Sequence, residues 1–139
     1  MSDVIINKAA TIERCVQRIR DEYGGDPRHL HENITKQDAI ILNLQRACEA
    51  CIDIAMVWVR SENLGLPQHS RESFDLLEQT GKLEPDLANA LKQMVGFRNI
   101  AVHDYQTLHL PIVQSIIEKH LDNFLAFASR AIKNSLRSV

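Results

Sequence analysis

Residues 96–105 hold the side chains of this chain that are best suited to chemistry on a phosphate group. The segment has the sequence Gly-Phe-Arg-Asn-Ile-Ala-Val-His-Asp-Tyr, which places Arg98, His103 and Tyr105 within eight positions. Arginine presents a planar fork of donors that stays charged at any working pH, and histidine titrates near neutrality and can both accept and donate a proton. We expect the apolar run 100–102 to pack against a core, so that the polar side chains face outward.

The spacing of Arg98 and His103 limits how the two side chains act together. Five positions correspond to about 140° around an ideal helix of 3.6 residues per turn, so within one regular helix they do not converge on one small target. Two arrangements bring them together: the helix breaks inside the motif, or two chains combine their residues in a two-fold dimer. The residues alone also allow a structural interpretation, in which Arg98 and His103 form a salt network around Asp104 at a helix end.

The pattern Arg-x4-His-x-Tyr resembles the signature of the HEPN superfamily of helical ribonucleases, in its HepT-like toxin branch. Residues 43–55, Asn-Leu-Gln-Arg-Ala-Cys-Glu-Ala-Cys-Ile-Asp-Ile-Ala, resemble the long second helix of that family, and residues 66–74 resemble its connection into the third helix. Together these segments cover most of positions 40 to 110. The resemblance implies a helical fold that is active as a homodimer, with Arg98 and His103 of both chains lining one cleft.

Such a cleft suits RNA cleavage that requires neither a metal nor a cofactor. The 2′-hydroxyl of RNA can attack its own phosphate, and two histidines from two chains can divide the acid and base roles. Two arginines would stabilise the phosphorane oxygens most strongly in the transition state. The need for a 2′-hydroxyl also selects RNA over DNA. Beside the catalytic pair Arg98 and His103 we expect supporting roles for Asn99 and Asp104, since Asn99 shares a helical face with His103.

Tyr105 lies two residues after His103 on a segment that we expect to be exposed. The resemblance implies that a cognate minimal nucleotidyltransferase antitoxin attaches AMP to Tyr105. A bulky anionic group at this position would repel RNA phosphates and fill the cleft. The residue type alone leaves other roles open, because a tyrosine can also stack on a base, bind a phosphate or pack its ring in an interface.

An alternative function is a helical binding subunit that docks on a nucleotidyltransferase and helps to hold its nucleotide or substrate without cleaving RNA. The intact Arg-x4-His pair favours the ribonuclease, because a docking subunit has no evident use for it. A purely structural helical dimer would explain the apolar pattern but not the polar residues at 98–105.

Further basic residues are candidates for contact with an RNA backbone. Arg130, Lys133 and Arg137 are spaced three and four apart and form a basic stripe near the end of the chain. A run of charges is also typical of a solvated helix face. Arg46 is a fourth candidate, on a polar ridge that it shares with Glu49 and Asp53, where we expect Glu49 to join an ion-pair row along its own helix.

The three cysteines and the paired histidines give weak metal signals. Cys48-x2-Cys51 lies in an apolar helical register, so we expect both side chains, like that of Cys15, to be buried small hydrophobic groups. His29-Leu30-His31 lacks carboxylate neighbours at a fixed spacing. We therefore predict no metal site.

Apolar spacing predicts the helices that position the motif. Ile5, Ala9, Ile12, Val16 and Ile19 recur at three or four residues and predict a helix over 4–22, followed by a polar loop over 26–33 in which Pro27 prevents helical continuation. A long helix capped at Thr35, with the Asp38 carboxylate three residues on to complete the cap, should reach Glu62. A short helix capped by Ser70 should cover 71–80, and one beginning near Pro85 should lead to the motif. A last helix should run from Pro111 past Ile132.

These patterns predict an all-α domain over residues 1–139, a bundle of four or five helices, because no segment alternates with period two. The chain of 139 residues carries 16 Lys and Arg against 18 Asp and Glu, a net charge of −2, so contact with RNA would need a local basic patch. No apolar run has the length of a membrane span, and the first residues lack the layout of a secretory signal. The simplest expectation is a cytoplasmic protein that makes no contact with membranes.

Overall fold

The computed structural model describes residues 2–137, which form seven α-helices, one 3-10 helix and no strand. The elements are α1 (Ser2–Tyr23), α2 (Arg28–His31), α3 (Ile34–Ser61), α4 (Ser70–Gln79), α5 (Pro85–His103), η1 (Tyr105–Thr107), α6 (Leu110–Lys119) and α7 (Leu121–Arg137). The all-α prediction is confirmed. The predicted count of four or five helices is wrong, because one predicted loop contains a helical turn and one predicted helix is divided into two.

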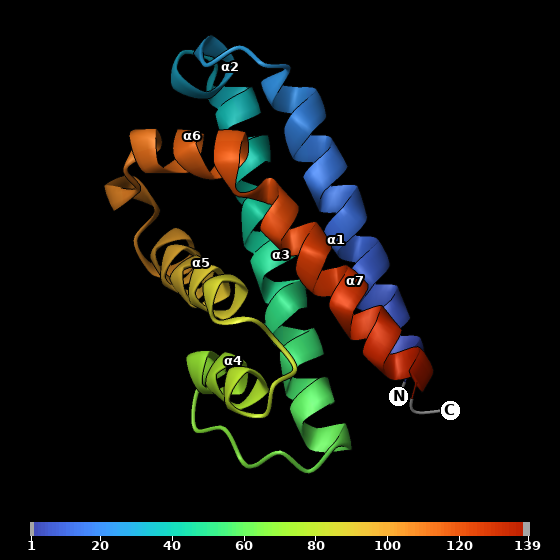
Figure 1. Ribbon diagram of the computed structural model, residues 1–139. Helices are drawn as coiled ribbons and strands as arrows, with labels where there is room; N and C mark the ends of the chain where they lie inside the picture. Colours follow the sequence, from blue (N-terminus) through green and yellow to red (C-terminus); the bar gives the residue numbers. More distant parts are fainter. Residues whose placement is uncertain (1, 138–139) are drawn as a thin grey trace.

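Helix α3 is the central element on which the others pack. It lies along α1 and also contacts α2, α4, α5 and α7, and the beginning of α1 and the end of α7 lie at the same end of the molecule (Figure 1). The apolar positions predicted for this helix are all buried: Ile41, Leu44, Cys48, Cys51, Ala55 and Trp58. Helix α3 contacts both α1 and α5, and its polar ridge of residues 46–53 lies beside these two helices.

The start of α3 differs from the prediction. The cap is Asn33 rather than Thr35, since the Asn33 side chain accepts a hydrogen bond from the Lys36 backbone N–H at 3.0 Å. Both residue types cap helices well, and the spacing of apolar residues does not choose between positions two apart. Asp38, predicted to complete the cap of Thr35, is therefore not needed there. Its side chain lies on the outside of the molecule instead.

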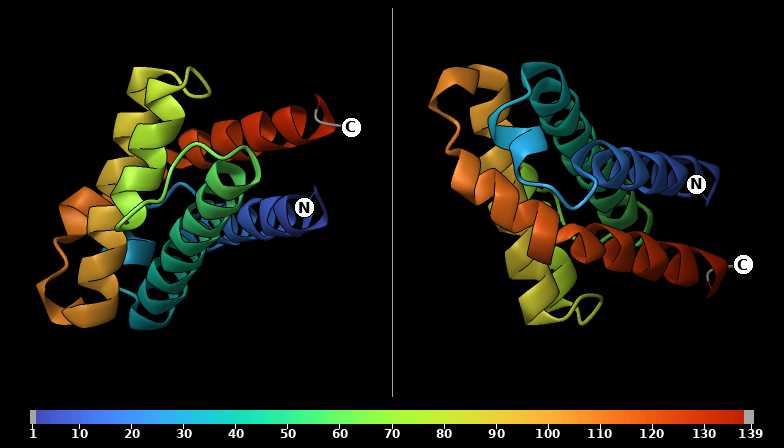
Figure 2. Two further views of the ribbon diagram at one scale, coloured as in Figure 1. Left: turned by 90° about the horizontal axis from the view of Figure 1, so that it is seen from below. Right: turned by 90° about the horizontal axis from the view of Figure 1, so that it is seen from above.

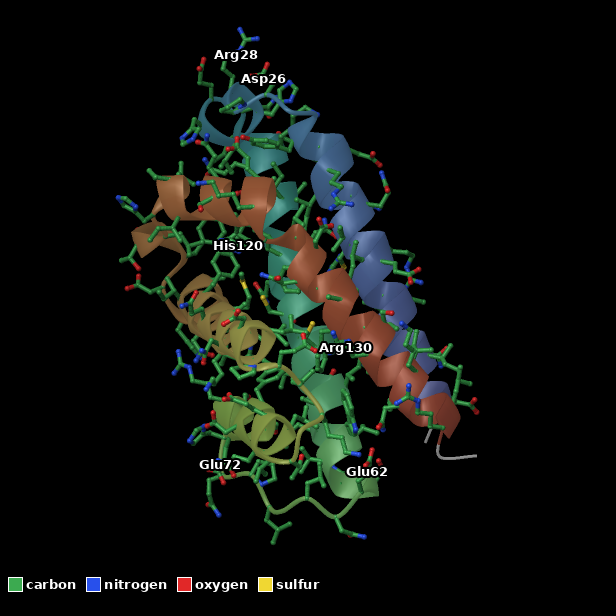
Figure 3. All side chains as sticks on the ribbon, viewed as in Figure 1. Asp26, Arg28, Glu62, Glu72, His120 and Arg130 are labelled. Carbon is green, nitrogen blue, oxygen red and sulfur yellow. The ribbon has the colours of Figure 1, made fainter. Side chains whose placement is uncertain are left out.

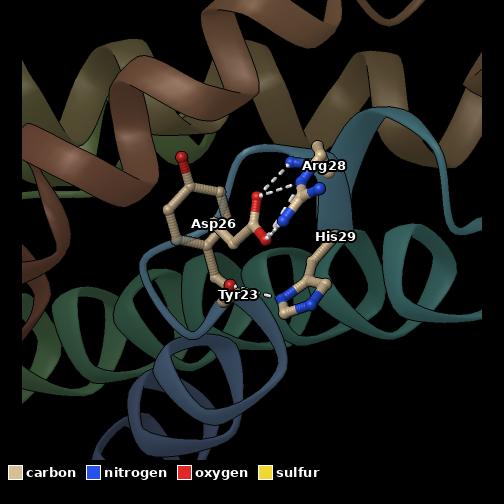
Figure 4. A network of polar contacts seen from close by, with 4 residues as sticks. All are labelled: Tyr23, Asp26, Arg28 and His29. Atoms are coloured by element: carbon tan, nitrogen blue, oxygen red, sulfur yellow. Dashed lines mark hydrogen bonds and ion pairs between the residues drawn. The ribbon is translucent and has the colours of Figure 1, made fainter.

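The predicted polar loop after α1 contains the single turn α2, which buries Leu30. Figure 4 shows how polar contacts close this turn: Asp26 pairs with the Arg28 guanidinium at 2.8 Å, and His29 Nδ1 donates to the Tyr23 carbonyl oxygen at 2.8 Å. The hydrogen bonds from Arg28 lower the pKa of Asp26 to about 2. Pro27 occupies the position before the turn, where its missing N–H costs nothing, so it starts α2 rather than preventing it.

The predicted last helix is divided at His120 into α6 and α7. Ile117 and Leu121 are buried and four residues apart, so the apolar spacing continues across the break and gives no sign of it. The two helix axes nevertheless point in different directions: α6 crosses the upper part of the molecule and α7 lies beside α1 and α3 (Figures 1 and 2). Apolar spacing indicates which side of a helix is buried but not the direction of the helix axis. The division into α6 and α7 therefore depends on how each helix packs on other elements.

The aromatic part of the core gives a test of stability. The Phe127 ring is fully buried, with its centroid 5.6 Å from that of Phe74 and 6.1 Å from that of Trp58. Phe127→Ala should lower the free energy of unfolding by about 3–5 kcal/mol, because it leaves a cavity beside the Phe74 and Trp58 rings. The matched control Leu66→Ala, at a side chain that is 87% exposed, should change it by less than about 0.5 kcal/mol. Urea unfolding followed by circular dichroism measures both, and equal values would contradict this account of the core.

Candidate functional site

Helix α5 runs without a break from Arg98 to His103, where it ends. Asp104 follows as the C-terminal cap, with its backbone N–H donating to the Ile100 carbonyl oxygen at 2.8 Å, and Tyr105 begins η1. The first predicted arrangement, a helix that breaks inside the motif, is therefore wrong. Arg98 and His103 lie on one helix, about 7.5 Å apart along its axis and about 140° apart around it.

The Arg98 guanidinium turns towards α3. Its Nε and Nη2 both donate to Glu49 Oε2 at 3.3 Å, and its Nη1 donates to Asn99 Oδ1 at 3.2 Å. Asp104 takes no part in these contacts, so the alternative of a salt network around Asp104 is wrong. The Arg98 side chain is 30% exposed, which leaves its donors within reach of a ligand from solvent.

Glu49 connects α3 with α5 through its ion pair with Arg98. Its spacing instead predicts an ion-pair row along its own helix. Glu49, Arg46 and Arg98 line one open pocket of about 380 Å³. The same pocket contains Asp53 and Lys8, which form an ion pair at 3.0 Å. Arg46 and Arg98 therefore line the same pocket, in which three cations face two carboxylates.

The His103 imidazole is exposed at the end of α5. Within residues 2–137 it has no hydrogen bond and no ion pair. Asn99 lies one turn earlier and is also exposed, but its side-chain oxygen contacts Arg98 rather than His103. Asn99 therefore makes no hydrogen bond to the imidazole beside which a supporting role was expected for it. Arg98 and His103 have no contact with each other either.

The apolar residues between Arg98 and His103 do not all pack inward. Ala101 is buried, but Ile100 is 45% exposed and Val102 is 42% exposed. The expectation that all three pack on a core is therefore wrong for two of them. On a helix whose buried side is already occupied by Ala101 and Phe97, Ile100 and Val102 flank the exposed His103 and give this end of α5 an apolar surface.

Tyr105 is partly exposed, and the partner of its hydroxyl is not among the predicted site residues. Its hydroxyl donates to Asp38 Oδ1 at 2.5 Å, and the Tyr105 side chain is 39% exposed. Burial and the adjacent carboxylate raise the pKa of Tyr105. No local signal identifies Asp38, which is 67 residues away in sequence, because the contact depends on the turn at Asp104 that brings η1 back to α3.

The basic stripe of α7 lies away from the motif. Arg130 forms an ion pair with Glu84, which precedes α5, and it lines a separate hollow of about 420 Å³ together with Lys133 and Arg137. Figure 3 places Arg130 on α7 and Glu62 at the end of α3, far from Asp26 and Arg28 on the α2 side. Glu84 precedes α5 and His103 ends it, so about 28 Å separates the partner of Arg130 from His103 along the helix.

The cysteines lie in the core, and the paired histidines each contact another part of the chain. Cys15, Cys48 and Cys51 are free and buried, as predicted, and burial raises the pKa of each thiol. His29 contacts the Tyr23 carbonyl oxygen, whereas His31 contacts the Gln114 side chain at 2.7 Å. The two imidazoles therefore have different partners. In the described part of the chain no group of three His, Cys, Asp or Glu side chains has the geometry of a metal site.

Comparison with known proteins identifies the family. A model of the HepT-like ribonuclease family matches residues 12–131, which include every element from the middle of α1 to α7. The chain belongs to the HepT-like ribonuclease family. The family match confirms the resemblance drawn from residues 98–105, confirms that the chain is a ribonuclease, and favours this function over the non-catalytic docking subunit.

Similar members of the HepT-like family include a curated protein and several solved structures. The chain is 54% identical to the mRNA nuclease HepT of Shewanella oneidensis over 127 residues, 91% of this chain and 95% of that one. It is 52% identical, with a TM-score of 0.89, to a tri-AMPylated Shewanella oneidensis HEPN toxin in complex with an MNT antitoxin, covering 96% of this chain and 99% of that chain. A toxin–antitoxin structure with AMP-PNP has the same TM-score and identity and covers 95% and 98%.

These neighbours confirm the HEPN fold for this HepT-like chain. Figure 1 shows the corresponding arrangement here, with the motif at the end of α5 next to η1 and α6. In residues 2–137 no helix is both long enough and apolar enough to cross a membrane.

Proposed function

We propose that this chain is the toxin of a toxin–antitoxin pair, a cytoplasmic, metal-independent ribonuclease whose active site forms between two copies of the chain. One observation carries the proposal: α5 is unbroken, and it directs Arg98 and His103 about 140° apart, so one chain does not bring both groups to the same phosphate. A two-fold dimer would place the same surface of each copy face to face and supply two of each group.

The surface around His103 supports the proposed dimer. Ile100 and His103 are three residues apart and share one helical face, and Ile100 carries exposed apolar area. An apolar groove of about 740 Å³ continues from Ile100 and Phe97 to Leu108 and Ile112, between α5 and α6. Exposed apolar area that adjoins a cluster of functional groups is typical of an interaction surface. A second copy seated here would bury Ile100 and bring its own motif to the cleft.

The proposed reaction is an internal transfer within RNA. His103 of one chain accepts the proton of the 2′-hydroxyl, whose oxygen attacks the adjacent phosphorus. The bond from phosphorus to the 5′-oxygen breaks, and the partner's His103 gives that oxygen a proton. The products are a 2′,3′-cyclic phosphate and a 5′-hydroxyl. Arg98 exchanges its partly exposed contact with Glu49 for the phosphorane oxygens, which carry more charge in the transition state than in the substrate.

The experiment that tests this function is cleavage of RNA by the purified chain in the presence of a strong chelator. We expect unchanged cleavage with excess EDTA and fragments that end in 2′,3′-cyclic phosphate. The salt concentration should be fixed near the physiological value, because phosphate contacts weaken steeply as salt rises. Cleavage that EDTA abolishes, or fragments that end in 3′-hydroxyl groups, would contradict the proposed chemistry.

The proposal extends to regulation by a nucleotidyltransferase antitoxin that attaches AMP to Tyr105. The tri-AMPylated relative in complex with its MNT antitoxin supports it. Accessibility supports Tyr105 over the other tyrosine, Tyr23, which is 4% exposed and binds Glu118 through its hydroxyl. Tyr105 is 39% exposed and follows His103 by two residues, so AMP at this position would add negative charge beside the cleft and repel the RNA backbone.

Tyr105→Phe should abolish AMP attachment, because the variant lacks the oxygen that attacks the nucleotide. Intact-protein mass spectrometry after incubation with the cognate antitoxin and ATP should show added AMP on the wild-type chain and none on the variant. The control Tyr23→Phe should gain AMP as the wild type does. Addition of AMP to Tyr105→Phe would place the modification on another residue.

A further inference from the structure

We propose that Asp38 is the proton acceptor for Tyr105 when the Tyr105 hydroxyl attacks a nucleoside triphosphate. This inference rests on the proposed attachment of AMP to Tyr105 and adds a residue of this chain to the chemistry of that step. The observation behind it is the hydrogen bond of 2.5 Å from the Tyr105 hydroxyl to Asp38 Oδ1, which joins η1 to the first turns of α3.

The Asp38 carboxylate has no cationic partner that would compete with Tyr105 for it among the described residues. Tyr105 is the one hydrogen-bond partner of the Asp38 side chain among the described residues, and no Lys, Arg or His forms an ion pair with it there. The two carboxylates of the pocket that Arg98 lines do have cationic partners, since Glu49 is paired with Arg98 and Asp53 with Lys8. Asp38 is also exposed, so the pair is open to a nucleotide that approaches from solvent.

Tyr105 needs such an acceptor because its hydroxyl stays protonated at neutral pH. A neutral phenol is a weak nucleophile, and an adjacent base activates it by removing its proton as the new bond forms. Burial and the Asp38 carboxylate raise the pKa of Tyr105, which makes the free phenolate scarcer still. A base within hydrogen-bond reach of the proton meets the geometric requirement for general base catalysis.

The step balances with ATP as the co-reactant. The Tyr105 Oη–phosphorus bond forms at the α-phosphate, and the bond from that phosphorus to the bridging oxygen breaks. Pyrophosphate leaves with the electron pair of that bond. The phenolic proton moves to Asp38 Oδ1, which afterwards releases it to solvent.

The pair formed by Tyr23 and Glu118 provides an internal comparison. The Tyr23 hydroxyl also donates to a carboxylate, that of Glu118, but Tyr23 is 4% exposed. A nucleotide held by a partner protein reaches the Tyr105 pair and not this one. The contact between Tyr and carboxylate therefore becomes reactive only where the hydroxyl is accessible.

The test compares the rate of AMP transfer from radiolabelled ATP by the cognate antitoxin to the wild-type chain, Asp38→Asn and Asp38→Glu. Asn keeps an oxygen that accepts the Tyr105 hydrogen bond but does not take the proton, so Asp38→Asn should be slower by about 10²-fold or more. Asp38→Glu keeps a base and should retain a larger share of the rate. Glu118→Gln, at the carboxylate that pairs with the buried Tyr23, should react at the wild-type rate. Thermal unfolding of each variant reports whether it is folded. If Asp38→Asn is not folded, the rate of Asp38→Glu decides the outcome.

The outcomes separate this inference from the proposed function. A slow Asp38→Asn with AMP still confined to Tyr105 supports Asp38 as the base. AMP transfer to Asp38→Asn at the wild-type rate overturns the inference alone, because the hydrogen bond then only positions Tyr105. Absence of AMP on the wild-type chain overturns both the inference and the proposed modification.

Discussion

His103→Ala is expected to lower the rate of RNA cleavage by about 10²–10⁴-fold, the range that a general acid or base contributes. The imidazole is exposed and has no hydrogen bond within the described chain, so its removal breaks no contact that supports the fold. Single-turnover cleavage of a defined RNA measures the change. The loss should appear in the rate at saturating protein, because the imidazole acts on protons in transit rather than in binding the substrate.

The control for His103 is another exposed imidazole, outside residues 96–105. His69 precedes α4 and lies 3.8 Å from Glu72. His69→Ala should cleave RNA at the wild-type rate. If His103→Ala is as active as His69→Ala, then His103 is not the acid or base of the reaction.

Arg98→Ala is expected to lower the rate of cleavage by about 10²–10³-fold, as for removal of one donor to a developing anion. The loss should not come from unfolding. The Arg98 and Glu49 side chains are 30% and 36% exposed, and an ion pair with that exposure is worth about 1 kcal/mol or less. Cleavage rate and thermal midpoint, measured on the same sample, separate the two effects.

Arg98→Lys distinguishes charge from geometry at the same position. Lysine keeps the positive charge but not the planar fork, so Arg98→Lys should recover only part of the activity lost in Arg98→Ala. Wild-type cleavage by Arg98→Ala would remove Arg98 from the catalytic pair. Equal activity of Arg98→Lys and the wild type would show that a point charge is sufficient.

The long helices could be predicted from the sequence because their apolar residues recur over many turns. The six predicted core positions of α3 from Ile41 to Trp58 are buried, and so are the five of α1 from Ile5 to Ile19. Short-range features gave weaker signals. A single apolar residue, Leu30, marks α2, and nothing in the spacing from Ile117 to Leu121 marks the change of direction at His120.

The polar residues of the candidate site could be selected from the sequence, but their partners could not. Arg98, His103 and Tyr105 lie within one short segment, and their chemistry follows from residue type. The contacts of Arg98 with Glu49 and of Tyr105 with Asp38 span 49 and 67 residues. Such contacts are set by how α5 and η1 pack on α3, and the periodicity of one helix does not contain that information.

The measurement that tests the shared active site most directly is RNA cleavage by mixed dimers of the wild-type chain and His103→Ala. A mixed dimer keeps one imidazole, whereas the proposed reaction uses the imidazoles of both chains as base and acid. We predict that mixed dimers cleave RNA far more slowly than wild-type dimers, so that activity falls roughly with the square of the wild-type fraction, with native mass spectrometry confirming the mixed dimer. Activity that falls only in proportion to the wild-type fraction while mixed dimers are present would contradict an active site built from two chains.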